Sequence, residues 1–120
     1  MGNPSNILEL LPGEVEMKKV SGDCWRTPDM WSSSQVPGKY TFTDSRILFR
    51  GSGIIEALRV CFAIPYSEID SIQTFMVALF PTGIQLTLKD GGIYKLSVMK
   101  RKEHIAFIEE QMRKCAERMA

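Results

Sequence analysis

Apolar and polar residues alternate in two adjoining stretches between residues 38 and 50. The apolar positions of these stretches are Tyr40 and Phe42, then Ile47 and Phe49. A period of two residues is typical of half-buried β-strands. The short polar side chains of Thr43-Asp44-Ser45, which separate the two stretches, bond to nearby backbone and favour a turn. The pattern predicts a β-hairpin over residues 38–50.

A second pair of alternating stretches covers residues 84–88 and 94–98. They flank Asp90-Gly91-Gly92, which is the kind of sequence that forms a tight hairpin turn with positive backbone φ angles. We therefore predict a second hairpin over residues 83–99. Weaker alternation predicts a first strand that ends near Ser21-Gly22, a strand over residues 58–64 closed by Pro65, and a less regular strand over residues 69–75.

The C-terminal stretch, residues 102–119, has a different period. Its apolar side chains are Ile105, Ile108, Met112, Cys115 and Met119, which lie on one face of an α-helix. On the opposite face Glu109 precedes Arg113 and Glu110 precedes Lys114 by four residues, the favourable order for pairs along a helix. This spacing predicts an amphipathic helix that packs one side against the strands.

Two apolar segments leave alternatives open. The run Phe75–Phe80 fits a strand buried on both faces, but it also fits an exposed tip that assembles with another copy or touches a membrane. Irregular residues 23–37 carry both tryptophans, Trp25 and Trp31. One of them is expected to cap the open end of the core, and the alternative is an aromatic lip on a binding groove.

Composition narrows the function classes. The 120 residues suit one domain, and 15 basic against 14 acidic residues give a net charge of +1, which does not favour a nucleic-acid partner. Three widely spaced cysteines form no disulfide framework or zinc motif. The N-terminus lacks the basic start and apolar run of a signal peptide. We expect a cytoplasmic protein, with contact to a membrane surface left open.

No group of residues points to catalysis. His104 is the single histidine, it has no nucleophile in a suitable sequence context, and we expect it at the surface or half-buried. No glycine-rich loop for phosphates precedes a helix. The sequence therefore predicts a protein that is not an enzyme and needs no cofactor.

Three segments resemble the GRAM and bacterial pleckstrin-homology-like families. Residues 38–49, Gly-Lys-Tyr-Thr-Phe-Thr-Asp-Ser-Arg-Ile-Leu-Phe, resemble the core "G-x-L-Y-L-T-N-x-R-L-I-F" of those families, with Phe42 for Leu, Asp44 for Asn and Ile47 for Leu. Residues 64–72 are similar to "I-P-L-x-D-I-x-x-I", and residues 83–91 to "G-I-x-I-x-T-K-D-G". Their order and spacing make the resemblance more specific than any one of them.

This resemblance implies a fold and two kinds of partner. The fold is mainly β (α+β), a pleckstrin-homology-like partly open barrel of two antiparallel sheets capped by the C-terminal helix. Residues 1–12 would be an N-terminal tail and residues 13–120 the domain. In lipid-binding members, basic residues of the first two strands and their loop hold phosphates; here these are Lys18, Lys19, Arg26 and Lys39. Acidic residues lie among them, which argues against tight inositide binding.

The function expected from the sequence is a non-catalytic interaction module that binds a protein or peptide partner or assembles with itself. The alternative is a peripheral binder of anionic lipid head groups. The residues expected to contact a protein or a membrane are Trp25, Trp31, Met76, Val77, Leu79 and Phe80.

Overall fold

Seven strands and one long helix make up the computed structural model, which describes residues 7–25, 35–53 and 60–119. The strands are β1 (Glu16–Trp25), β2 (Gln35–Thr43), β3 (Arg46–Gly51), β4 (Cys61–Pro65), β5 (Ile69–Val77), β6 (Phe80–Leu88) and β7 (Ile93–Val98). A 3-10 turn, η3 (Tyr66–Glu68), joins β4 to β5, and helix α1 (Arg101–Met119) follows β7.

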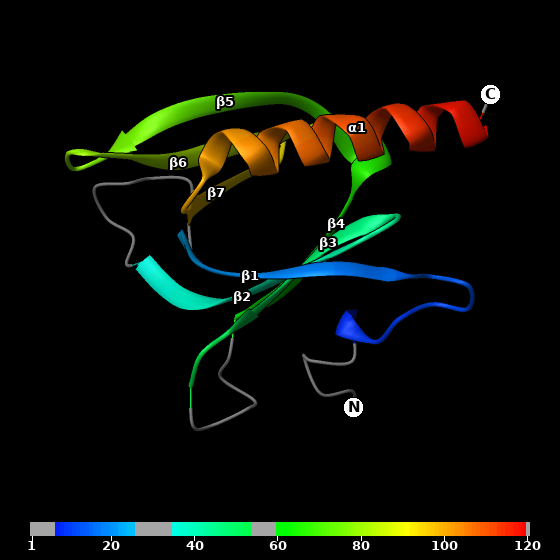
Figure 1. Ribbon diagram of the computed structural model, residues 1–120, viewed down its shortest axis with the longest axis horizontal. Helices are drawn as coiled ribbons and strands as arrows, with labels where there is room; N and C mark the ends of the chain where they lie inside the picture. The colour runs from blue at the N-terminus through cyan, green and yellow to red at the C-terminus, as the bar shows by residue number, and fades with distance from the viewer. Residues whose placement is uncertain (1–6, 26–34, 54–59, 120) are drawn as a thin grey trace.

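The strands form one antiparallel sheet in the order β4-β3-β2-β1-β7-β6-β5. Strand β1 pairs with β2 along almost its whole length, but with β7 only over Gly22–Cys24. At this short junction the sheet bends into two halves that face each other, and α1 lies along one open side (Figure 1). The predicted fold, a partly open antiparallel barrel with a C-terminal helix, is confirmed.

Both predicted hairpins are present, and their turns are held by the expected polar side chains. In the β2–β3 turn the Thr43 hydroxyl accepts hydrogen bonds from the backbone N–H groups of Ser45 and Arg46. In the β6–β7 turn Gly91 has a φ of +93°, and the Asp90 carboxylate accepts from the N–H of Gly92 at 2.8 Å. Local chemistry alone therefore explains these two hairpins.

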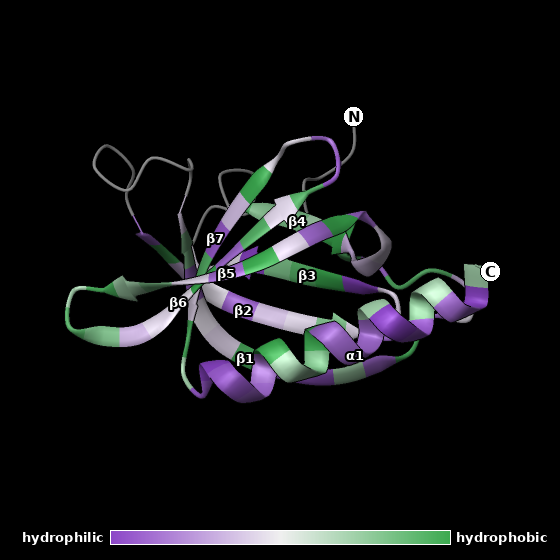
Figure 2. Ribbon diagram, turned by 90° about the horizontal axis from the view of Figure 1, so that it is seen from above, coloured by the Kyte–Doolittle hydropathy of each residue, from purple (hydrophilic) through white to green (hydrophobic). Residues whose placement is uncertain are grey.

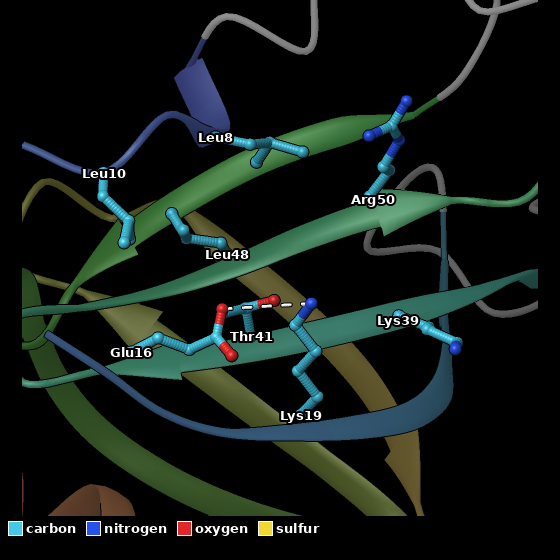
Figure 3. Close-up of a pocket in the computed structure, with 8 residues that line it drawn as sticks. All are labelled: Leu8, Leu10, Glu16, Lys19, Lys39, Thr41, Leu48 and Arg50. Carbon is cyan, nitrogen blue, oxygen red and sulfur yellow. Dashed lines mark ion pairs between the residues drawn. The ribbon is translucent and has the colours of Figure 1, made fainter.

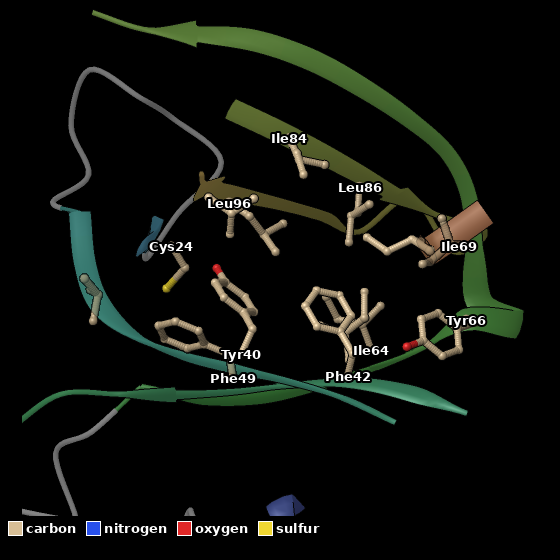
Figure 4. Packing of buried hydrophobic residues seen from close by; sticks show 14 of the residues in the cluster. Cys24, Tyr40, Phe42, Phe49, Ile64, Tyr66, Ile69, Ile84, Leu86 and Leu96 are labelled. Atoms are coloured by element: carbon tan, nitrogen blue, oxygen red, sulfur yellow. The ribbon is translucent and has the colours of Figure 1, made fainter. Parts of the chain in front are cut away.

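The core lies between the two halves of the sheet and under α1. Its largest fully buried side chains include Tyr40, Phe42, Phe49, Ile64, Tyr66, Ile84, Leu86, Leu96 and Ile108 (Figure 4). Two phenols satisfy their hydroxyl groups within this core: Tyr40 donates to the carbonyl of Asp23 at 2.6 Å, and Tyr66 to that of Thr43 at 2.8 Å. The apolar pattern of the strands thus supplies most of the core.

Helix α1 differs from the sequence expectation at both ends. Ile108 and Cys115 are buried as predicted, but Met119 is 74% exposed because it lies in the last turn, beyond the sheet. His104 is buried at 8% exposure rather than lying at the surface, since its ring stacks on Phe42. The helical face that meets the sheet therefore includes a polar residue near its start.

The first strand and the fourth also differ from the prediction. Strand β1 does not end at Ser21-Gly22 but continues to Trp25, because Gly22 lies in the crossing with β7 and does not form a turn. Strand β4 begins at Cys61, and residues 58–59 of the predicted strand lie outside the described residues.

A nearly buried ion pair ties the segment before β1 to the β2–β3 turn. The Arg46 guanidinium donates to both carboxylate oxygens of Glu14, at 2.8 and 2.7 Å. The hydroxyls of Thr43 and Ser45 and the N–H of Leu11 complete the hydrogen bonds to this carboxylate. Arg46 also donates to the carbonyls of Ile7 and Glu9. Residues 7–14 are thereby fixed against β3, and the domain boundary at residue 13 stays a prediction.

Candidate functional site

The β5–β6 hairpin ends in an exposed apolar turn, here called the hairpin tip (Met76–Phe80). Val77 pairs with Phe80, so Ala78 and Leu79 form the turn, and Ala78 has a φ of +53°. Leu79 is 88% exposed, Phe80 65% and Met76 53%, whereas Val77 is half-buried. The expectation of a strand buried on both faces is therefore wrong, and the run is the exposed tip that the sequence left as the alternative.

The base of the hairpin tip is held by α1 and by aromatic packing. Arg101 donates to the backbone carbonyls of Phe75 and Gly83, at 3.0 and 3.2 Å. The Phe75 ring covers Gly83, where an added Cβ would lie 2.6 Å from ring atoms, and Trp25 packs edge-to-face on the same ring. Trp25 therefore packs beside the base of the hairpin tip, while Trp31 lies outside the described residues.

Positive charge and a shallow groove lie beside the hairpin tip. Met99, which is 73% exposed, and the exposed Lys100 and Lys102 follow β7 and begin α1. With Phe80 and Pro81 they line a groove of about 420 Å³. Figure 2 shows the apolar end of the hairpin projecting beyond the sheet, next to the polar start of α1. The hairpin tip is thus a convex apolar surface with cations at its base.

The structure separates Lys18 from the other described members of the predicted phosphate-binding set. Lys18 and Lys19 are neighbours on β1, and successive side chains of a strand point to opposite faces. Lys18 points under α1, where its amine donates to His104 Nδ1 at 2.9 Å and lies 4.2 Å from the centre of the Phe107 ring. Lys19 lies on the outer face, and Arg26 is outside the described residues. Lys18 is therefore a packing residue in this structure.

The Lys18–His104 contact predicts a pH-dependent stability. Burial, and then the nearby Lys18 cation, lower the pKa of His104 below its usual 6.5. The neutral ring is therefore favoured in the folded state, and the unfolded state binds more protons once the pH falls below 6.5. We expect the melting temperature to fall between pH 7.5 and 5.5, and a His104→Asn variant to lose this dependence. An equal slope for both proteins in thermal melts would contradict the assignment.

A pocket of about 250 Å³ lies on the outer face of β1, β2 and β3, and we call it the outer-face pocket (Figure 3). It gathers Lys19 and Lys39, both predicted, with Arg50, which sequence reasoning missed. The signal for Arg50 was present, because it pairs directly with Lys39 in the predicted hairpin. Leu8, Leu10, Glu16, Thr41 and Leu48 complete its lining.

The described residues provide no arrangement typical of a metal centre or a membrane span. Within residues 7–25, 35–53 and 60–119, no three His, Cys, Asp or Glu side chains gather closely enough to hold a metal ion. Over the same ranges, no helix combines the length and the apolar character needed to cross a membrane.

Comparison with known proteins identifies the fold and not the family. No protein-family model matches the chain, and no curated protein matches its sequence. Among solved structures, the C-terminal domain of an unknown protein from Leishmania infantum is similar with a TM-score of 0.67 and 18% identity, over 91% of both chains. The Vps36 N-terminal PH domain has a TM-score of 0.63 and 14% identity, over 92% of this chain and 86% of that one.

A third similar structure is the DH/PH fragment of PDZRHOGEF, solved in complex with human RhoA. Its TM-score is 0.59 at 11% identity, and the likeness covers 84% of this chain but only 29% of that chain. The similarity at such low identity concerns the backbone arrangement: seven antiparallel strands followed by one helix. The protein has a pleckstrin-homology-like fold.

Proposed function

We propose that the protein is a non-catalytic interaction module of the GRAM or bacterial pleckstrin-homology-like kind that docks on an anionic membrane surface. The contact surface is the hairpin tip, and the location is peripheral to a cytoplasmic membrane face. The proposal is supported by one observation above all: Leu79 of the two-residue turn and its close neighbours Phe80 and Met76 are all largely exposed. The three sequence motifs described above favour the GRAM-like assignment.

The apolar side chains of the hairpin tip are exposed to water, and burying them at a lipid interface is energetically favourable. Burying a side chain such as Leu79 or Phe80 contributes about 1.5–3 kcal/mol. Lys100 and Lys102 lie near the base of the hairpin tip, where each adds about 1 kcal/mol on an anionic surface. Glu103 is the acidic residue that lines the adjacent groove. The balance of charges beside the hairpin tip therefore favours anionic lipid.

Vesicle co-sedimentation tests this proposal. We expect binding to vesicles that contain phosphatidylserine, weaker binding to pure phosphatidylcholine, and a decrease as salt is raised, because salt screens the lysines. A Leu79→Ser/Phe80→Ser double variant is expected to bind at least about tenfold more weakly, equivalent to about 1.4 kcal/mol. Leu11→Ser removes an exposed leucine of another segment and is the matched control, with unchanged binding. Absence of binding at low salt would contradict the proposal.

A protein partner, or a second copy of the chain, is the second candidate because of the groove beside the hairpin tip. Its volume of about 420 Å³ and its apolar walls, Phe80, Pro81 and Met99, suit a side chain from another protein. Sedimentation velocity over a range of concentrations tests assembly of the chain with itself. Association that is abolished by the Leu79→Ser/Phe80→Ser variant, together with no binding to vesicles, would favour this candidate over the membrane.

A further inference from the structure

The outer-face pocket shares no residue with the hairpin tip and has a different chemistry. Its floor comes from paired positions of neighbouring strands: Lys19 lies opposite Thr41, and Thr41 lies opposite Leu48. Lys39 and Arg50 form the next facing pair on the same side of the sheet. Residues that alternate along paired strands share one face, so these side chains meet in a single concavity.

The pocket has an apolar end and a cationic end. Figure 3 shows Leu8, Leu10 and Leu48 grouped at one end and Lys39 and Arg50 toward the other, with Lys19 and Thr41 between the two groups. The two lysines, Lys19 and Lys39, outnumber the one carboxylate of the lining, Glu16, whose exposed pair with Lys19 has a nitrogen–oxygen distance of 3.9 Å. Such an exposed pair contributes little, so the site keeps a net positive charge.

The leucine end is built in advance of any ligand. Leu8 and Leu10 belong to the segment before β1, and this segment is fixed by the hydrogen bonds from Arg46 to the carbonyls of Ile7 and Glu9. Arg46 is itself held by Glu14, whose side chain is only 2% exposed. The apolar wall therefore does not have to be ordered when a ligand binds, which removes part of the cost of association.

We propose that the outer-face pocket binds a small anionic amphiphile, a short apolar chain that ends in a phosphate or a carboxylate. The leucines would contact the chain, while Lys19, Lys39 and Arg50 would contact the anion and the Thr41 hydroxyl would donate to it. The volume of about 250 Å³ lies below the usual 300–1,000 Å³ of drug-sized ligand sites, so the ligand is small. Neither end alone accounts for the pairing of leucines and cations in one pocket.

An NMR titration of the whole chain with octyl phosphate, kept below its micelle concentration, tests the proposal. Inorganic phosphate carries only the anion and octanol only the chain. We expect octyl phosphate to shift the amide signals of Leu10, Lys19 and Thr41. It is also expected to bind at least about tenfold more tightly than inorganic phosphate or octanol, a difference of about 1.4 kcal/mol. Equal binding of octanol, or shifts confined to the hairpin tip, would overturn the proposal.

Two single variants separate the ends of the pocket. Lys39→Gln removes one cation and Leu10→Ser one apolar wall residue, and each is expected to weaken octyl phosphate binding at least about threefold, a loss of about 0.65 kcal/mol. Lys114→Gln, an exposed lysine of α1 outside both candidate sites, is the control and leaves binding unchanged. Thermal melts of the same variants show whether they remain folded. Unchanged binding by both folded variants would overturn the proposal.

The same chemistry exists as a free metabolite or as a membrane lipid. Vesicles that contain phosphatidic acid, added to the Leu79→Ser/Phe80→Ser variant, distinguish the two sources because this variant lacks the hairpin tip contact. Binding that depends on Lys39 identifies a lipid as the source. Binding of octyl phosphate without vesicle binding identifies a soluble ligand. The octyl phosphate titration and these vesicle measurements test the outer-face pocket even if the hairpin tip does not dock on membranes.

Discussion

Replacing Arg46 by alanine is expected to lower the free energy of unfolding by about 3–5 kcal/mol. The Glu14 side chain is 2% exposed and that of Arg46 12%, so the substitution leaves a carboxylate out of water without its cation. It also removes the donors to the carbonyls of Ile7 and Glu9. Guanidinium denaturation at neutral pH measures the difference, and limited proteolysis is expected to cut residues 7–11 sooner.

The matched control is Arg113→Ala. Arg113 pairs with Glu110 and Glu117 on the exposed face of α1, where ion pairs contribute little to stability. Arg46→Lys keeps the charge but loses the bidentate contact with Glu14. Its loss in the free energy of unfolding is expected to lie between those of the two alanine variants. Similar losses for Arg46→Ala and Arg113→Ala would show that the Glu14–Arg46 pair contributes no more than a surface contact.

The same ion pair contributes stability that depends on pH in the acid range. Hydrogen bonds from Arg46, opposed by burial, lower the pKa of Glu14 from 4.5 to about 2. Because the folded pKa is depressed, the stabilisation is fully present above pH 4.5 and is lost as the pH falls toward 2. In Arg46→Ala this contribution is lost already at neutral pH, so the difference in stability between the two proteins is expected to shrink as the pH falls from 4.5 toward 2.

Local patterns predicted the two hairpins, but not the position of the run Phe75–Phe80. Both hairpin turns carry polar or glycine residues that hold a turn by themselves, as Thr43 and Asp90 do. The turn at Ala78-Leu79 carries neither, and Ala78 adopts a positive φ without a glycine. A short apolar run has the same sequence signature whether it is buried or exposed. The run is exposed because the joined ends of β5 and β6 project beyond the other strands, and this depends on the tertiary structure (Figure 1).

The candidate sites show the same division between local and tertiary information. Alternation on one strand already separates Lys18 from Lys19, and hairpin pairing already joins Lys39 to Arg50. These two relations could be derived from sequence. The contact between Lys18 and His104 joins residues 86 positions apart, and the leucine wall depends on the bonds made by Arg46. The periodicity of the sequence does not predict such contacts, because they arise only when α1 and the N-terminal segment pack on the sheet.

The junction between the two halves of the sheet depends on Gly22. Glycine is needed there because the strands approach closely: an added Cβ would lie 2.6 Å from the backbone oxygen of Ser97 and 2.7 Å from a Val98 methyl. Strand β1 meets β7 over only three residue pairs, so a shift at this point affects the whole junction. The substitution Gly22→Ala is therefore expected to cost about 2–3 kcal/mol, in the range of overpacked cores.

Denaturant unfolding with hydrogen exchange measures this effect and locates it. Because the junction alone pairs the halves through backbone bonds in the described sheet, we expect faster exchange at Cys24, Leu96 and Val98 than in the β2–β3 hairpin. Ser21→Ala, at the exposed neighbouring position, is the control and is expected to stay within about 0.5 kcal/mol of the original protein. A Gly22→Ala protein as stable as this control would show that β7 can move away without loss, and that packing across the core rather than the β1–β7 ladder holds the two halves together.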